Sequence, residues 1–422
     1  MTDRKQRFVI GLLSMLVAGI LAGCSAGQDD LPAAPIQPSV TSSEVTGYRA
    51  PEVNSADAVA TADDEETQLE AAREAIGITQ EQLEQTMAEQ AGKYAYETMD
   101  ESYRLLYAEL LLIMQKQGEN IKVSTNDSDI LQYVFQCVYN DHPEIYWVDG
   151  YSYVRHTRGD EILYLTFTGK YTYSLEEIRV NQIYIDQYKA TCFAYIPNNA
   201  SEYEKVKHVY EYIIENTDYV ISARDNQNIL SVFLYGESVC QGYAKATQYL
   251  LNELGVACTM VVGRVHSGEG HAWNLVQIDG AYYYVDTTWG DASYIIEGEA
   301  ASEAAMPVSY EYLNITTEQL QLTHVIENVV PMPHCMETAN NYYVRENLYL
   351  TAYDTAVLGN MFDTAYAEGA DSVTFKCADS NVFSFVCDEL IGNQQIFNFL
   401  HSETTSVVYS VSEEQLTLSF WL

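Results

Sequence analysis

One stretch decides the fold, and from Ser238 to Asp291 it reads SVCQGYAKATQYLLNELGVACTMVVGRVHSGEGHAWNLVQIDGAYYYVDTTWGD. It contains a thiol, an imidazole and a carboxylate, at Cys240, His271 and Asp286. Such groups can serve as a nucleophile, as its base and as the group that orients the base. The residues around each of them indicate how the chain brings them together.

Cys240 is predicted to stand in the first turn of a helix. Apolar residues recur after it at three- and four-residue spacing, and Gly255 then ends the pattern. Free N–H groups and the positive end of the helix dipole stabilise a thiolate at such a position. Because the thiolate is the nucleophile, a reactive cysteine gains from this placement. The apolar positions are Tyr243, Ala246, Leu250, Leu251 and Leu254.

Two strands after this helix are predicted to form a hairpin with Asp279-Gly280 as its turn. A two-residue turn there makes His271, on the first strand, and Asp286, on the second, diagonal neighbours on one face of the sheet. The carboxylate can then fix the tautomer of the imidazole, while the imidazole takes the thiol proton. The strands span residues 271–277 and 281–287, and Ile278 pairs with Ala281.

The order of these residues resembles that of the transglutaminase-like superfamily of papain-type folds. The resemblance covers roughly residues 201–291. It implies an α+β core in which a helix bearing the cysteine packs on an antiparallel sheet bearing the histidine and the aspartate. It also implies acyl transfer from protein or peptide carboxamides, through a cysteine thioester, to an amine or to water. The matching blocks are YEYIIENTDY at Tyr210–Tyr219, VCQGYA at Val239–Ala244, GHAWN at Gly270–Asn274 and YYYVDTTWGD at Tyr282–Asp291.

The catalytic residues that the resemblance implies are Cys240, His271 and Asp286. His266 competes as the base, but it lies in a Gly-rich loop, and Asp291 competes as the carboxylate, but it falls past the predicted strand. Papain-type proteases have an oxyanion-donor Gln a few residues before the cysteine, whereas residues 233–239 contain none, so the Cys240 N–H is one candidate donor. The residues predicted to line the cleft are Gln241, Trp273 and Trp289.

Two other functions stay open at this point. The superfamily also includes proteases and inactive members, so the chain could be a cysteine protease or amidase of the cell envelope. It could also be a non-catalytic surface binding or scaffold protein with a transglutaminase-like fold. The presence of all three catalytic residue types argues against the second alternative.

The 422-residue chain has a formal net charge of −39. A nucleic-acid-binding protein must neutralise phosphates with Lys and Arg, so this class is excluded. The same charge argues against adsorption to an anionic membrane surface. The expected partner is a protein or peptide substrate, and the sequence carries no signal for an oligomeric state. No CxxC pair or nucleotide motif is present, so we predict neither a metal nor another cofactor.

The N-terminus is predicted to be a targeting signal rather than a folded element. Arg4, Lys5 and Arg7 precede an apolar run, and Leu21-Ala22-Gly23-Cys24 resembles a bacterial lipobox. We therefore expect a signal peptide over residues 1–23 and lipid modification of Cys24. The protein would then be extracytoplasmic and held at the bacterial cell membrane by this lipid anchor alone.

Composition divides the remaining chain into four parts. Residues 24–70 are acidic and lack an apolar period, which predicts a disordered tether. Residues 71–197 mix helical and strand patterns, as expected of an α+β domain. The catalytic domain is predicted over residues 198–335. Residues 336–422 form a small α+β domain, so two smaller α+β regions flank the core.

Overall fold

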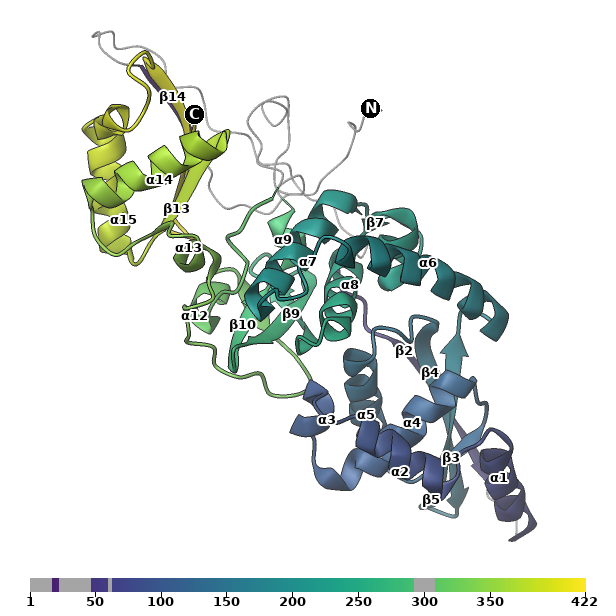
Figure 1. Cartoon of the computed structure of the whole chain (residues 1–422). Coiled ribbons are helices and arrows are strands. Elements are labelled where there is room, and N and C mark those ends of the chain that lie inside the picture. The colour runs from purple at the N-terminus through teal and green to yellow at the C-terminus, as the bar shows by residue number, and fades with distance from the viewer. Residues whose placement is uncertain (1–16, 23–46, 60–62, 292–307) are drawn as a thin grey trace. The chain divides into compact units, whose positions relative to one another are not determined.

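The computed structural model describes residues 17–22, 47–59, 63–291 and 308–422, and it mixes helices with sheets (Figure 1). The chain forms two compact units. The large unit contains residues 45–288 and 324–334, and the small unit contains residues 1–44, 289–323 and 335–422. The predicted boundary between residues 197 and 198 falls inside the large unit, and the predicted catalytic segment 198–335 contributes to both units.

The N-terminal part of the large unit packs helices against a four-stranded sheet. Phe135, Tyr151 and Phe167 meet at the centre of its core, with ring centroids 4.4–6.1 Å apart. The sheet order is β2-β4-β5-β3. The helices are α1 (Asp63–Ala75), α2 (Gln80–Glu89), α3 (Tyr94–Thr98), α4 (Arg104–Lys116) and α5 (Ser128–Asp141), and the strands are β2 (Glu52–Val59), β3 (Ile121–Val123), β4 (Val148–Arg158) and β5 (Glu161–Tyr171).

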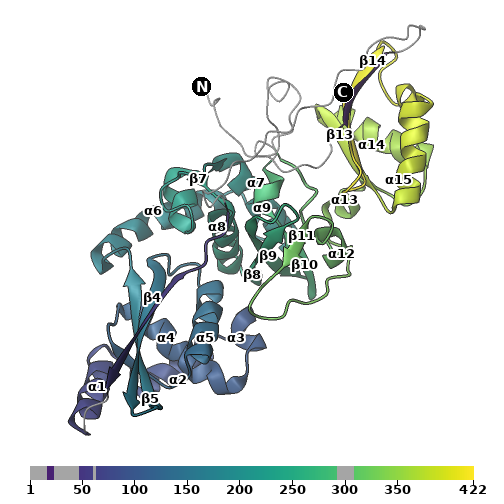
Figure 2. The ribbon, with the colours of Figure 1, turned by 180° about the vertical axis from the view of Figure 1, so that it is seen from behind.

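The predicted tether, residues 24–70, is folded in part. Strand β2 pairs in parallel with β4, beside which it lies in Figure 2, and α1 begins within the same predicted tether. Nearly all side chains of β2 are exposed, so main-chain hydrogen bonds and ion pairs such as Asp57–Arg155, at 2.6 Å, hold the strand. An edge strand of this kind needs no apolar period, and the prediction of disorder is wrong for it. Residues 23–46 and 60–62 of the predicted signal and tether lie outside the described residues.

The second part of the large unit is a helical layer on an antiparallel sheet of order β10-β9-β8-β11. Helix α8 packs directly on β8 and β9 (Figure 1). This arrangement confirms the predicted fold, in which the helix bearing Cys240 covers an antiparallel sheet. The elements are α6 (Leu175–Phe193), α7 (Glu202–Asn216), α8 (Cys240–Glu253), β8 (Cys258–Val265), β9 (Gly270–Ile278), β10 (Ala281–Val285) and β11 (His324–Ile326).

The small unit has its own sheet, of order β1-β14-β15-β13-β12, with a core built around Phe362, Phe375 and Phe420. Strand β1 (Val17–Ala22) belongs to the predicted signal peptide and pairs antiparallel with β14. Among the described helices, none is both long enough and apolar enough to cross a membrane. The other elements are α9 (Thr287–Gly290, at the boundary of the units), α12 (Thr317–Leu320), α13 (Tyr342–Arg345), α14 (Thr355–Glu368), α15 (Ser380–Cys387), β12 (Tyr349–Leu350), β13 (Ser372–Cys377), β14 (Ser406–Ser412) and β15 (Thr417–Trp421).

Candidate active site

Cys240 is the first residue of α8, as the sequence predicts. Two buried hydroxyls support the start of this helix, because Ser231 Oγ and Ser238 Oγ hydrogen-bond to each other at 2.6 Å. A Cβ atom at Gly242 would collide with both of them, which explains the glycine two residues after the cysteine. The local sequence therefore fixes Cys240, the predicted nucleophile, at a helix N-terminus, where main-chain N–H groups are free.

The hairpin brings His271 to Asp286 in the predicted manner. Ile278 pairs with Ala281 across the Asp279-Gly280 turn, whose two residues have φ of 53° and 81°. His271 Nε2 then lies 2.6 Å from Asp286 Oδ2. The Cys240 side chain also hydrogen-bonds to the imidazole of His271. The structure thus joins the three predicted catalytic residues in one series of contacts.

Burial makes the charges in this series strongly dependent on one another, since Cys240, His271 and Asp286 are only 0%, 5% and 1% exposed. Burial alone would lower the pKa of His271, but the charges of Asp286 and Cys240 and the hydrogen bonds to both raise this pKa to about 10. Burial likewise opposes ionisation of Asp286, yet His271 and His324 hold the pKa of this carboxyl well below its usual range. An imidazolium and a carboxylate therefore face each other at neutral pH.

A second histidine, His324, contacts the same carboxylate. Its Nε2 lies 3.1 Å from Asp286 Oδ2, and the residue opens β11, where it pairs with Val265 of β8. Burial and the nearby charge of His271 lower the pKa of His324, in spite of its bond to Asp286. Since a carboxylate can only accept, the neutral ring donates from Nε2. No sequence motif marks His324, because it lies 38 positions beyond Asp286 and outside the blocks that carry the resemblance.

Asp286 is held on its other side by the main chain, since the Thr288 N–H donates to Oδ1 at 2.9 Å. The carboxylate thus accepts at least three hydrogen bonds, from His271, His324 and Thr288, which fix its orientation. The competing candidates lie elsewhere: His266 is exposed at the turn after β8, and Asp291 forms an isolated bridge with Val308 in the small unit.

The residues predicted to line the cleft have different surroundings. The ring of Trp273 lies 5.9 Å from that of His271 and 5.0 Å from that of His324, so it is a wall of the buried imidazole pair. Gln241 is buried directly after the nucleophile, and its Nε2 donates to Tyr139 Oη at 3.2 Å. Trp289 packs edge-on against Tyr312 within the small unit.

His271, Asp286 and His324 also form a group whose donor atoms all lie within 4.8 Å of one another. Two imidazoles and a carboxylate are chemically able to hold a metal ion. Here Nε2 of His271 and Nε2 of His324 each lie at hydrogen-bonding distance from Asp286 Oδ2. A metal ion would have to replace both of these hydrogen bonds.

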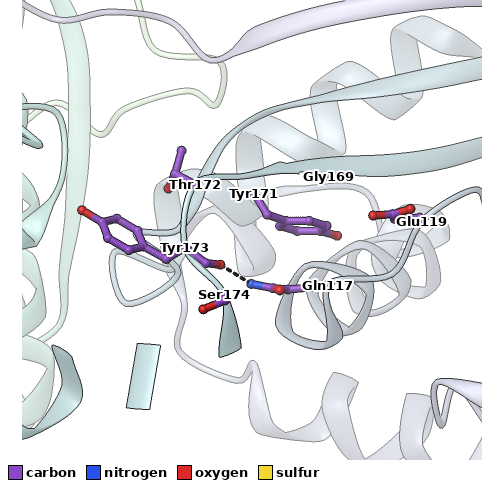
Figure 3. Close-up of a pocket in the computed structure, with 7 residues that line it drawn as sticks. All are labelled: Gln117, Glu119, Gly169, Tyr171, Thr172, Tyr173 and Ser174. Atoms are coloured by element: carbon purple, nitrogen blue, oxygen red, sulfur yellow. Dashed lines mark hydrogen bonds between the residues drawn. The ribbon is translucent and has the colours of Figure 1, made fainter. Parts of the chain in front are cut away.

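A separate pocket opens in the N-terminal part of the large unit (Figure 3). Gln117 Nε2 donates to the Tyr173 carbonyl oxygen across it, at 2.6 Å. The lining contains neither cysteine nor histidine, so it lacks the groups of the site around Cys240. The seven residues are Gln117, Glu119, Gly169, Tyr171, Thr172, Tyr173 and Ser174.

The segment that contains Cys240, His271 and Asp286 is similar to known proteins. Residues 189–287 match the model of the "Transglutaminase-like superfamily". Over 106 residues the chain is 29% identical to the kyphoscoliosis peptidases of Mus musculus and Homo sapiens. This alignment covers 21% of this chain and 16% of each relative. The matched part is thus about a sixth of the length of these relatives. A solved structure of a TGase aligns with a TM-score of 0.26 and 19% identity over 37% of this chain and 48% of that chain.

Proposed function

We propose that this chain, which contains a domain of the transglutaminase-like superfamily, is a thiol enzyme that acts on protein or peptide carboxamides. One observation carries the proposal, namely the buried series of contacts from the Cys240 thiol through the His271 ring to the Asp286 carboxylate. A histidine held protonated between a thiol and a carboxylate suits a cysteine nucleophile and a general acid.

In the proposed reaction Cys240 has given its thiol proton to His271, and the thiolate sulfur attacks the carbonyl carbon of a carboxamide. The C–N bond breaks, the leaving amine takes a proton from His271, and a thioester remains on Cys240. An amine or a water molecule then loses a proton to His271 and attacks the thioester, which releases the sulfur. Asp286 stays ionised and orients the ring throughout, and the N–H of Cys240 is a candidate donor to the oxyanion.

The second nucleophile decides the biological outcome. A lysine side chain as acceptor gives an isopeptide cross-link, whereas water makes the enzyme a protease or amidase. Two assays distinguish these outcomes: incorporation of a fluorescent amine into a glutamine-containing protein, and release of a fluorophore from peptide amides. EDTA in parallel samples reveals whether a metal contributes.

Cys240→Ala serves as the control in both assays, and we expect it to give only the background signal. Equal signals from the wild type, from the Gly47→Ala variant described below and from Cys240→Ala would overturn the enzymatic proposal. The chain would then be better described as a binding or scaffold protein with this fold.

For the location of the enzyme, we propose an extracytoplasmic protein anchored by lipid at Cys24. The proposal is supported by the sequence Leu21-Ala22-Gly23-Cys24 behind a basic and then apolar N-terminus. We expect the mature protein to begin at a lipid-modified Cys24 and to partition into detergent. A mature form that begins elsewhere, or a Cys24→Ala variant that is processed and partitions like the wild type, would contradict the anchor.

A further inference from the structure

The main chain of residues 47–49 runs directly over the nucleophile. The side chain of Tyr48 packs on an apolar bed that includes Cys240 itself. A Cβ atom at Gly47 would lie 3.8 Å from Cys240 Sγ. Because Cys240 is fully buried, a substrate carboxamide reaches the sulfur only after this segment moves. The bed consists of Cys240, Ala244, Met260, Val262 and Ala272.

The segment is held by the hydrogen-bond pattern of a β-strand. On one side, the Tyr48 N–H donates to the carbonyl oxygen of Gly270, the residue before His271, at 3.1 Å. On the other side, the side-chain amide of Gln227 donates to the Gly47 carbonyl oxygen at 3.2 Å and accepts from the Arg49 N–H at 3.0 Å. In a parallel sheet, one residue of the neighbouring strand donates to the carbonyl before its partner and accepts from the N–H after it. The side-chain amide of Gln227 forms the same two bonds on either side of Tyr48.

Gln241 completes this polar frame. Its Oε1 also accepts from the Arg49 N–H, at 3.2 Å, while its Nε2 is fixed by Tyr139. Main-chain atoms occur in every polypeptide, so a frame made of Gln227, Gln241 and the Gly270 carbonyl recognises an extended chain irrespective of its side chains. Selectivity must come from the space and charge around the individual residues.

Three features set that selectivity. A Cβ atom at position 47 would collide with the Gly270 carbonyl oxygen, so only glycine fits there. The next side chain, Tyr48, lies on the apolar bed. Arg49 Nη2 then lies 2.7 Å from Asp149 Oδ1, which favours a base at the third position. A chain with a net charge of −39 attracts cationic peptides in general.

We propose that residues 47–49 occupy the substrate cleft of this enzyme in cis, and that the cleft binds extended polypeptide with glycine beside the nucleophile, an aromatic residue next and a basic residue third. This inference deepens the proposed function and rests on it, because it names the class of substrate that Cys240 would meet. The segment is then a strap that keeps the nucleophile covered until it is displaced.

The first test uses Gly47→Ala in the full chain, with alkylation of Cys240 by iodoacetamide followed by peptide mapping. The added methyl group expels the strap, so we expect Cys240 to react at least about tenfold faster than in the wild type. Gly359→Ala is the matched control, since a Cβ atom at Gly359 meets no other atom. Gln227→Ala removes two bonds to the strap and should accelerate alkylation independently. Circular dichroism checks the folding of each variant.

The second test uses two peptides with residues 47–51, GYRAP, and its variant AYRAP, both acetylated and amidated. Millimolar GYRAP should slow alkylation of Cys240 in Gly47→Ala again, and AYRAP should not. Unchanged alkylation in both folded variants, or equal protection by both peptides, overturns the proposal. The variants could show faster alkylation and protection by GYRAP alone, while neither Gly47→Ala nor the wild type shows turnover in the two enzyme assays. In that case the enzymatic proposal fails, and the proposal of peptide binding stands.

Discussion

The two units bury similar chemical groups but arrange them differently. In the large unit, Cys240 stands at a helix start beside the His271–Asp286 ion pair. In the small unit, Cys377 ends β13, and burial raises the pKa of its thiol to about 12. The neighbouring Lys376 is buried too, but its ammonium donates to two oxygens of Gln415. Burial of thiols and charges is thus common to both units, whereas a base aligned on a thiol is described only in the large one.

The largest expected difference between the units concerns their thiols. Cys240→Ala should abolish turnover, because the covalent intermediate cannot form. Cys377→Ala should leave kcat/KM within about twofold, since burial keeps its thiol protonated near neutral pH and no described hydrogen bond joins it to a base. Both variants are compared with the wild type in the assay that shows activity. Turnover that survives Cys240→Ala, or disappears only in Cys377→Ala, would reverse the assignment.

The second comparison concerns the two aspartates that follow β10. Asp286→Asn removes the charge that raises the pKa of His271 and should lower kcat roughly 10²- to 10⁴-fold. Asp291 belongs to the small unit, so Asp291→Asn should cost much less. Because the proposed general acid is the protonated ring, activity should fall as the pH rises towards 10, the pKa of His271. In Asp286→Asn this alkaline limb should move to lower pH.

If Asp291→Asn lowers kcat more than Asp286→Asn does, the role proposed for Asp286 is contradicted. The role is also contradicted if the activity of Asp286→Asn falls at the same alkaline pH as that of the wild type. Circular dichroism of both variants excludes unfolding as the cause of lost activity.

Much of this site could be predicted from the sequence because its determinants are local. Asp279-Gly280 fixes the turn, the turn fixes the register, and the register places His271 beside Asp286. The helical period and Gly255 likewise place Cys240 at the start of α8.

The missed parts depend on contacts between residues far apart in the chain. His324 reaches Asp286 only because β11 adds to the edge of β8. Tyr48 of the strap lies 222 positions before its partner Gly270. The two residues are joined through main-chain atoms, which a sequence pattern does not reveal. Edge strand β2 was missed for the same reason, since main-chain pairing leaves no apolar period.

The third prediction separates His324 from His271, the two histidines that share one carboxylate. His324 donates to Asp286 without contacting Cys240 in any described bond, so we expect it to position the carboxylate. His324→Phe removes this donor and should lower kcat roughly 10- to 100-fold, in line with ~1.5–3 kcal/mol for a hydrogen bond to a charged group. KM should stay unchanged, because His324 is buried behind the ion pair.

His324→Gln is the matched control, since its amide can still donate and should restore most of kcat. A loss in His324→Phe that appears mainly in KM would contradict a positioning role. An equal loss in both variants would show that the imidazole itself is required.

The smallest expected effect concerns stability and compares the buried lysines of the two units. Burial lowers the pKa of Lys245 to about 7, although Asp149 and Glu144 oppose the shift, and its ammonium lies 3.5 Å from the centre of the Tyr139 ring. The folded chain therefore binds this proton less tightly than the unfolded chain, whose lysine has a pKa of 10.5. The cost of burying the charge is full below pH 7 and fades as the pH rises towards 10.5.

Lys245→Met should consequently stabilise the protein at pH 6 by roughly 1–3 kcal/mol, and by less at pH 9. Lys376→Met should destabilise it instead, because the oxygens of Gln415 would lose a buried donor. Urea unfolding at both pH values measures the two effects, followed by fluorescence for the whole chain and by hydrogen exchange for each unit. If Lys245→Met is less stable than the wild type at pH 6, the contact of its ammonium with Tyr139 outweighs the cost of burying the charge. The two lysines would then stabilise their units in the same way, and the contrast drawn between them would fail.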